Sequence, residues 1–391
     1  MSIVAVHYDP TDAATHADPY PLYAALRRDA PLSLNSELGV WALARHDDVL
    51  AALEDRAAFA SSLVSLSPLD RYLGLREAGY VAGDSARHDV LRRVLRGILG
   101  RRPVERMEPD IRRIAETLLD ELAGTTVPDL AAGYARRLPV LVTCALLGLP
   151  EADEATIAAG VEAVFSRVPG RVELPAAGPA GYTELCAYLR AAGRDGASAA
   201  LATLAAAHEA GEITDAEVID IAFILVAAGV KTTSTLIGGM LLALAENPDQ
   251  AALVWNDRVP VADIVEETLR YDAPAQWVAR VAVRQTATPH GVIPAGARVL
   301  LLLGSANRDE RRYDDPGRFD VERERRRHLA FGSGLHFCSG SGLARLEARV
   351  ALEALRARAA PPVLAGAPAR IFSPAERELG ALPLRITIAP R

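Results

Sequence analysis

The chain has 391 residues, of which 50% are hydrophobic, 24% charged and 5% aromatic. This balance is typical of a folded protein with a large apolar core, and it excludes a disordered or collagen-like chain. The formal net charge of −7 is modest and negative, so the overall charge does not indicate nucleic acid as a partner.

The first residues, "MSIVAVHYDPTDAATHADPYPLY", have no basic segment followed by an apolar run, so we expect no secretory signal and a cytoplasmic protein. Three cysteines, Cys144, Cys186 and Cys338, are too few for a disulfide framework. We therefore expect each to be a free thiol or a ligand. Cys144 and Cys186 lie among leucines and alanines, which is typical of core thiols.

Helical patterns dominate the chain. Residues 88–100 place aliphatic side chains at helical spacing, with arginines on the other side. Thr214 and Glu217 form a capping-box pattern that predicts the start of a long apolar helix. Lys231 lies in the middle of that helix, so a buried helix fits it better than a membrane span. Two further helices are expected at residues 138–153 and 343–360.

Strand patterns are few and far apart in the sequence. They occur near residue 40, in "GVWALAR", and at residues 279–283, 297–303 and 382–388. We therefore expect a mainly α-helical fold with a small β region built from distant segments. The chain has no repeat, low-complexity tract or clear linker, so residues 1–391 are expected to form a single large domain.

Cys338 lies in a glycine-rich turn just before a helical stretch. The glycines allow another rigid body to approach the backbone closely. The following helix directs N–H groups and the positive end of its dipole toward the sulfur, which favours a thiolate. His336 is badly placed as the base for a thiol nucleophile. A lone thiolate suits an iron that already has four other ligands. A zinc ion would need further ligands of the Cys-x-x-Cys type, and the sequence has none.

The segment "FGSGLHFC" resembles the haem-binding signature F-G-x-G-x-H-x-C of the cytochrome P450 family. The matching residues are Phe331, Gly332, Gly334, His336 and Cys338. The resemblance implies the cytochrome P450 fold, haem b as cofactor and Cys338 as the proximal iron ligand, with the matching residues and Gly340 around the haem. A thiolate ligand donates electron density that favours O–O cleavage.

Glu267 and Arg270 stand three residues apart, on one face of a helix. On spacing alone, most such pairs are solvated surface bridges. In order with the cysteine loop, however, the pair resembles the E-x-x-R motif of cytochromes P450, which Arg318 of "DPGRF" completes. The resemblance implies a structural role for this triad, behind the haem.

The long helix carries "AAGVKTTS", residues 227–234. Gly229 leaves room for another group to lie against the helix, and Thr232 can bond back to the carbonyl of Ala228. A helix that packs through small residues would show the same pattern. The segment resembles the A-G-x-[DE]-T segment of the family, which implies an oxygen-binding groove at Gly229 and a role for Thr232 in proton delivery.

Lys231 departs from this pattern, because the family usually has Asp or Glu there. An ammonium group cannot accept a proton. Three explanations are open. Lys231 points outward and water with Thr232 suffices; Lys231 anchors an acidic group of the substrate; or the reaction is atypical, such as oxidative C–C or C–N coupling or a peroxide-driven oxidation.

Haem propionates need fixed cations, and arginine binds them best. The family pattern implies His88, Arg92, Arg280 and His328 in this role. Arginines also lie between Asp89 and Glu105 with no acidic residue among them, at positions 92, 93, 96, 101 and 102. A solvated helix face or RNA binding would fit this run, but the resemblance implies docking of an acidic ferredoxin or flavodoxin.

By analogy, the substrate pocket is formed by residues 60–84, 155–200, 275–279 and 376–383 and by part of the long helix. Its candidate residues are Ala227, Ala228, Gln276, Trp277 and Val278. These walls are mostly apolar, so we expect a small hydrophobic or aromatic natural product. Trp277 would either stack on a flat substrate or belong to the core.

The resemblance thus implies a bacterial cytochrome P450 monooxygenase that hydroxylates or epoxidises a small molecule. O2 and two electrons would come to it through a ferredoxin-type partner and its reductase. We expect a monomer with no membrane or nucleic-acid partner. Two rivals remain: a non-catalytic haem-binding sensor or carrier, which Lys231 and Ser339 leave open, and a thiol hydrolase without haem.

Overall fold

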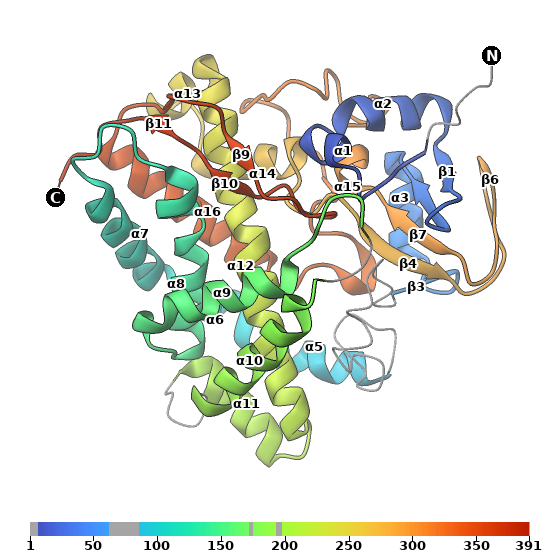
Figure 1. Ribbon diagram of the computed structural model, residues 1–391, viewed down its shortest axis with the longest axis horizontal. Helices are drawn as coiled ribbons and strands as arrows, with labels where there is room; N and C mark the ends of the chain where they lie inside the picture. Colours follow the sequence, from blue (N-terminus) through green and yellow to red (C-terminus); the bar gives the residue numbers. More distant parts are fainter. Residues whose placement is uncertain (1–6, 62–85, 172–174, 193–197, 391) are drawn as a thin grey trace.

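The computed structural model describes residues 7–61, 86–171, 175–192 and 198–390. Helices predominate, and short strands gather mainly on one side (Figure 1). The helices are α1 (Ala13–Ala17), α2 (Tyr20–Asp29), α3 (His46–Glu54), α5 (Ala86–Leu99), α6 (Arg101–Arg106), α7 (Glu108–Leu122), α8 (Arg137–Leu147), α9 (Glu154–Phe165), α10 (Ala177–Ala192), α11 (Ala199–Glu209), α12 (Asp215–Glu246), α13 (Pro248–Trp255), α14 (Val261–Tyr271), α15 (Leu303–Ala306) and α16 (Ser341–Arg358), with short turns η1 (Ala131–Ala135), η2 (Glu151–Asp153) and η3 (Gly334–His336).

The strands are short and come from distant parts of the chain. They are β1 (Leu32–Asn35), β2 (Val40–Leu43), β3 (Phe59–Ala60), β4 (Val278–Ala282), β5 (Thr286–Thr288), β6 (Gly291–Ile293), β7 (Arg298–Leu301), β8 (Val363–Leu364), β9 (Ala369–Arg370), β10 (Leu379–Ala381) and β11 (Leu384–Arg385). One sheet has five strands in the order β1-β2-β7-β4-β3, in which β2 and β7 are parallel and the other neighbours antiparallel.

The sequence predicted most of these elements. Strands near residue 40 and at 279–283 and 297–303 are confirmed as β2, β4 and β7, and the helix expected at 88–100 is confirmed as α5. The strand expected at 382–388 is wrong in length, because only Leu384 and Arg385 pair, with β8. The helix expected at 138–153 ends at Leu147, because Gly148 takes a left-handed conformation with φ of 65°.

Helix α12 crosses the middle of the molecule and is about 48 Å long at about 1.5 Å per residue (Figure 1). The predicted capping box is confirmed: Thr214 and Glu217 each bond the backbone N–H of the other. Among the described helices it alone is long and apolar enough to cross a membrane, but 78% of its most apolar window is buried inside the protein. It is therefore a core helix.

The two halves of α12 belong to two apolar cores. Its second half packs with α7, α8, α14 and α16, and its first half packs with α5, α8, α9, α10 and α11. Cys144 and Cys186 are buried in the second of these cores, as expected. A third core lies between the sheet and α3. These contacts hold α5, α12 and the turn before α16 around the candidate site.

Candidate active site around Cys338

The loop that carries Cys338 is closed by its own backbone. The Cys338 N–H donates to the carbonyl of Phe331 at 3.0 Å, and the N–H of Phe337 donates to the carbonyl of Gly334 at 3.1 Å. Gly332 and Gly334 both have φ of 68°, a conformation that side chains disfavour. The loop therefore needs glycine at these two positions for its own shape.

Gly334 is also required by its neighbour. A Cβ atom there would lie 3.0 Å from the carbonyl oxygen of Leu53, at the end of α3. Beside it, the hydroxyl of the fully buried Ser333 donates to Glu54 at 2.6 Å. The loop is therefore docked on α3, which fixes where Cys338 lies.

Cys338 is exposed, although protein atoms crowd around its sulfur. This burial raises the pKa of the thiol. The N–H of Gly340 and the positive charges of Arg92 and Arg345 act in the opposite direction but do not outweigh burial. The N–H groups at the start of α16 therefore favour the thiolate, as expected, and a cation bound at the sulfur would favour it further.

Helix α5 brings two predicted cofactor residues to this loop. Arg92 donates to the carbonyl of Phe337 at 2.9 Å and to the hydroxyl of Ser339 at 2.5 Å. The rings of His88 and His336 lie edge to face, with centroids 4.9 Å apart. His88 is 1% exposed, and its Nε2 atom has no hydrogen-bond partner among the described residues.

An orphaned, buried ring nitrogen beside a fixed guanidinium is a donor set that suits a carboxylate. His88 and Arg92 therefore fit the propionates of the haem that the sequence implies, next to an exposed thiol. Arg280 is also buried, on β4, where it donates to the carbonyl of Ala279 at 2.8 Å. The described residues contain no group of three or more His, Cys, Asp or Glu side chains that would hold a metal by themselves.

His328, the fourth residue predicted to hold a propionate, contacts protein groups in this structure. Its Nε2 atom lies 3.2 Å from the carboxylate of Glu266, and its Nδ1 atom accepts the N–H of Ala330 at 3.2 Å. Glu266 is in turn held by Arg345, at 2.6 and 3.1 Å. Both ring nitrogens of His328 thus have protein partners in this structure, and its contact with a propionate stays a prediction.

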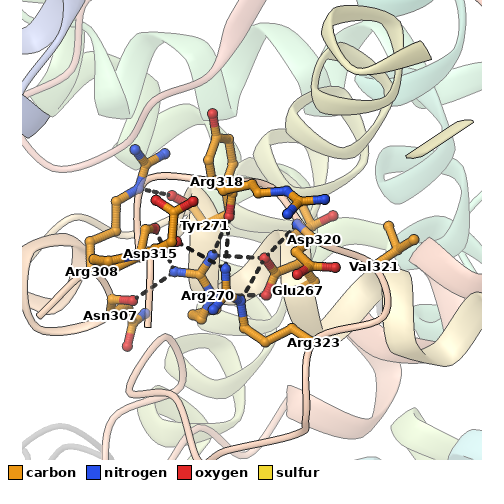
Figure 2. Close-up of polar contacts among 12 residues, drawn as sticks. Glu267, Arg270, Tyr271, Asn307, Arg308, Asp315, Arg318, Asp320, Val321 and Arg323 are labelled. Carbon is orange, nitrogen blue, oxygen red and sulfur yellow. Dashed lines mark hydrogen bonds and ion pairs between the residues drawn. The ribbon is translucent and has the colours of Figure 1, made fainter. Parts of the chain in front are cut away.

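The E-x-x-R pair lies on α14 and is buried (Figure 2). Arg270 donates to both carboxylate oxygens of Glu267, at 2.7 and 2.8 Å. It also donates to the carbonyls of Asn307, Pro316 and Arg318. The pair therefore ties α14 to the loop before residue 320 and acts in the fold, as expected.

The third member of this group is Arg323 and not Arg318. Arg323 Nε lies 3.3 Å from Glu267 Oε1, and its side chain is 14% exposed (Figure 2). Arg318 contributes only its backbone carbonyl to the group, which accepts bonds from Arg270 and Arg323, and its side chain is exposed. The prediction for Arg318 is wrong because the turn at residues 314–320 directs that side chain outward.

On α12, the face at Ala228, Gly229 and Thr232 is the less buried part of a buried segment. Ala228 is exposed, and Gly229 and Thr232 are partly exposed. Thr232 Oγ1 donates to the carbonyl of Ala228 at 2.7 Å, as predicted. The helix is nevertheless uninterrupted from Asp215 to Glu246, so this back-bond does not open a turn.

Lys231 lies on a neighbouring face and is 3% exposed. Its Nζ atom lies 2.5 Å from Glu378 Oε2 and 3.5 Å from Glu162 Oε2. Arg136 joins the same two carboxylates, at 3.3 and 3.1 Å. These four side chains, from the start of α8, α9, α12 and the start of β10, form a closed ion network that we call the Lys231 network.

Two of the three explanations for Lys231 do not fit this arrangement. Lys231 does not point outward, because it is buried. It is also not free to anchor an acidic substrate group, because Glu378 already neutralises it. Sequence reasoning missed Glu378, Glu162 and Arg136, since nothing in their local patterns indicates that they meet α12.

Of the expected pocket residues, only Ala228 is exposed. Ala227 is 4% exposed and Val278 packs against the core under the sheet. Trp277 is partly buried against an apolar cluster and donates its indole N–H to the carbonyl of Pro374, contacts that favour a role in packing over one in substrate stacking. Gln276 is buried beside Gly304. The wall expected at residues 62–84 lies outside the described residues.

Comparison with known proteins agrees with this site. The family model described as cytochrome P450 matches residues 258–355. "Putative cytochrome P450 123" of Mycobacterium tuberculosis is 38% identical over 360 residues, covering 90% of this chain and 89% of the relative. "Cytochrome P450 monooxygenase PikC" of Streptomyces venezuelae is 35% identical, covering 94% and 91%. The solved structure of cytochrome P450 CYP109Q5 from Chondromyces apiculatus has a TM-score of 0.86 at 33% identity, covering 98% and 99%.

The fold and the relatives define a bacterial haem protein of the monooxygenase class. The chain belongs to the cytochrome P450 family. Its relatives are named as monooxygenases and hydroxylases, among them "6-deoxyerythronolide B hydroxylase" of Saccharopolyspora erythraea, 33% identical over 360 residues.

Proposed function

We propose that this protein uses haem b, with Cys338 as the iron ligand, to hydroxylate or epoxidise a small hydrophobic or aromatic natural product. The observation that carries the proposal is the Cys338 loop: an exposed thiol in a rigid glycine turn, with His88 and Arg92 positioned beside it. The name of the relative that hydroxylates 6-deoxyerythronolide B supports a natural-product substrate.

Cys338, His88, Arg92, Arg280 and His336 would hold the haem, and the backbone at Phe331, Gly332, Gly334 and Gly340 would shape its seat. When bound, the haem supplies activation of O2, and the thiolate supplies electron density that favours O–O cleavage. Arg92 has two effects here. It holds the loop through its bonds to Phe337 and Ser339, and its positive charge opposes the rise that burial causes in the pKa of Cys338.

Thr232 is the group that we assign to proton handling. Its hydroxyl hydrogen is held by the carbonyl of Ala228, so the oxygen lone pairs are free to accept a hydrogen bond from the partly exposed side. Gly229 and Ala228 leave that side open, since neither has a long side chain. The hydroxyl is thus oriented before substrate binds.

The Lys231 network favours the ordinary monooxygenase reaction over an atypical one. Position 231 carries a cation, but the buried carboxylate of Glu378 lies 2.5 Å from its ammonium group. Glu162, which is 42% exposed, connects the same ammonium group with solvent. An acidic group is therefore still present at this turn of α12, supplied by another segment of the chain.

Charge inversion of the pair tests this assignment. Glu378→Gln should lower the fraction of reductant that ends in product, and Lys231→Glu should do the same, because it faces two carboxylates. The double variant Lys231→Glu with Glu378→Lys restores one charge of each sign and should recover coupling. Glu162→Gln is the control, with a smaller effect. Unchanged coupling in Glu378→Gln would remove this pair from the mechanism.

Isotopically labelled O2 tests the reaction class itself. Compounds that shift the Soret band are turned over with a surrogate ferredoxin and reductase, and the product is examined by mass spectrometry. Monooxygenation places one labelled oxygen atom in the product and the other in water. A product without label would favour oxidative coupling instead.

For its electron supply, we propose an acidic ferredoxin or flavodoxin that docks beside α5 and α6. Arg96 and Arg102 are exposed and have no ion-pair partner among the described residues, whereas Arg93 and Arg101 are paired with Glu212 and Glu105. Arg92 is turned to the Cys338 loop. The free cations of this face are therefore fewer than the sequence suggested.

We further propose a cytoplasmic monomer formed by residues 1–391, with no nucleic-acid or membrane partner.

A further inference from the structure

A cavity of about 710 Å³ lies against the second half of α12, away from the Cys338 loop. Gly239, Leu242, Ala243 and Glu246 line one side of it, at positions that fall on one face of the helix. The ends of α1 and α14, the start of α2 and the segment around Arg370 complete its walls. Its volume is in the range of small-molecule sites.

Part of the polar lining is structural. Asp272 accepts bonds from Tyr20 at 2.5 Å, from Arg377 at 2.8 Å and from Arg370 at 3.3 Å. Arg377 also donates to the carbonyl of His16 at 2.7 Å. These groups satisfy one another and hold the N-terminal helices, α14 and the C-terminal segment together. They form a rigid wall.

Arg308 is different, because only part of its guanidinium group is used. Its plane lies over the rings of Tyr20 and Tyr271, with the carbon 3.4 and 3.9 Å from the ring centroids, and Nε donates to the carbonyl of Tyr271 at 2.7 Å. Its two Nη groups have no hydrogen-bond partner among the described residues. A guanidinium fixed in this way is preorganised to bind a carboxylate or phosphate in bidentate fashion.

Glu246 provides the complementary group. It ends α12 and is exposed, and its carboxylate makes no hydrogen bond or close ion pair in the described part of the chain, although the charge of Arg370 acts on it. Between Glu246 and Gly239 the helix offers Leu242 and Ala243 as an apolar surface. A Cβ atom built at Gly239 meets nothing within 4 Å, so the cavity reaches the helix backbone there.

We propose that this cavity binds a small polar anion, a carboxylate or phosphate held by Arg308, that also carries an amino or hydroxyl donor for Glu246. Such a ligand would bridge α2, α12 and α14. The proposal goes beyond the proposed function and does not depend on it, because none of the cavity's lining residues is assigned to holding the haem or to proton handling. Arg377 alone belongs to the segment 376–383 that was expected to border the substrate pocket.

Calorimetric titration of the haem-loaded protein tests the proposal, with three probes: leucine, which carries both a carboxylate and an ammonium group, citrate and inorganic phosphate. We expect at least one to bind with a Kd in the millimolar range or tighter. Arg308→Gln should weaken that binding about tenfold or more. Arg308→Lys keeps the positive charge but loses the bidentate geometry, so its affinity should lie between those of the wild-type protein and Arg308→Gln.

Two further variants locate the ligand. Gly239→Leu places a side chain inside the cavity, so it should abolish binding. Leucine is well tolerated in a helix, so the melting temperature and the haem spectrum should stay unchanged. Glu246→Gln should weaken leucine binding but not binding of phosphate, which lacks a cationic donor. An unchanged Soret band on titration separates this site from the haem site.

Absence of heat with all three probes would overturn the proposal. So would binding that survives both Arg308→Gln and Gly239→Leu, since the ligand would then lie elsewhere. Neither result depends on the reduced carbon monoxide spectrum or on turnover, so failure here is distinguishable from failure of the proposed function.

Discussion

Glu347, on the inner face of α16, is a carboxyl group buried among aliphatic side chains. It is 3% exposed, and its Oε2 atom has no hydrogen-bond partner among the described residues. Burial raises its pKa well above the ordinary value of 4.5. The folded protein therefore holds a proton there that the unfolded chain releases above about pH 4.5. Below that pH, Glu347 does not lower the free energy of unfolding. As the pH rises toward the pKa that Glu347 has in the folded protein, the free energy of unfolding falls.

We predict that Glu347→Met stabilises the protein, and more so at high pH. Methionine fills a similar volume without a group that needs a proton. The gain in free energy of unfolding should be about 1–3 kcal/mol at pH 8 and clearly smaller at pH 5, measured by urea unfolding of both proteins. An equal gain at both pH values would contradict the pKa that we assign to Glu347.

A second prediction concerns the buried group around Glu267. Arg323→Gln removes a charged partner of Glu267 and should lower the free energy of unfolding by about 1–3 kcal/mol. Arg318→Gln is the matched control in the same loop, and it should change stability by less than about 0.5 kcal/mol because that side chain is exposed. Thermal unfolding with haem content as a second readout checks both. A larger loss in Arg318→Gln would reverse the assignment.

These residues also show where sequence patterns stop being informative. The i, i+3 spacing put Glu267 and Arg270 on one face of a helix, but only the resemblance to the E-x-x-R motif predicted that the pair has a structural role. The choice between Arg318 and Arg323 depends on how an irregular loop turns, which local patterns do not specify. The Lys231–Glu378 contact joins segments that only the tertiary fold brings together.

At the scale of elements, the Cys338 loop depends on its contact with α3. We predict that Gly334→Ala destabilises the protein by about 1–2 kcal/mol and lowers haem retention, because alanine disfavours φ of 68° and its Cβ would press on the carbonyl of Leu53. Gly342→Ala is the control, since a Cβ there meets nothing within 4 Å and the residue is helical.

Haem content per protein and the melting temperature measure both effects. Gly342→Ala should leave both unchanged or raise the melting temperature slightly. If Gly334→Ala retained haem as well as Gly342→Ala does, docking of the loop on α3 would not be what positions Cys338.

Long periodic elements were predicted well, and short ones were not. Aliphatic periodicity located α5, the capping box located the start of α12, and a run of good helix formers located α16. Strands of two or three residues, such as β11, are created by pairing with a distant partner and have little pattern of their own. The cavity beside Arg308 gave no signal in the sequence, because its walls come from parts of the chain that only the tertiary fold brings together.

At the scale of the whole molecule, charge is unevenly distributed. The net charge is −7, yet Arg96 and Arg102, on α5 and α6, are exposed cations with no ion-pair partner in the part of the chain that the structure describes. Phe337, on the Cys338 loop, is 38% exposed. An acidic partner would be steered to this face despite the overall negative charge of the protein, and such steering weakens as salt shortens the range of the interaction.

We therefore predict that reductase-supported turnover falls as ionic strength rises. Arg96→Glu with Arg102→Glu should slow the first electron transfer about tenfold or more at low salt and remove most of the salt dependence. Arg258→Glu, at an exposed position in the turn between α13 and α14, is the control for a charge reversal outside this face. Turnover that is flat from low to high salt would contradict docking at this face.

The central claim is that Cys338 ligates a haem iron, and the reduced carbon monoxide complex tests it most directly. Thiolate-ligated haem gives a strongly red-shifted Soret band in this complex. We predict that band for the wild-type protein and for Cys144→Ala, a control at a buried core thiol, and its loss in Cys338→His with haem still bound. Absence of the band in wild-type protein purified with haem, or its persistence in Cys338→His, would contradict the account.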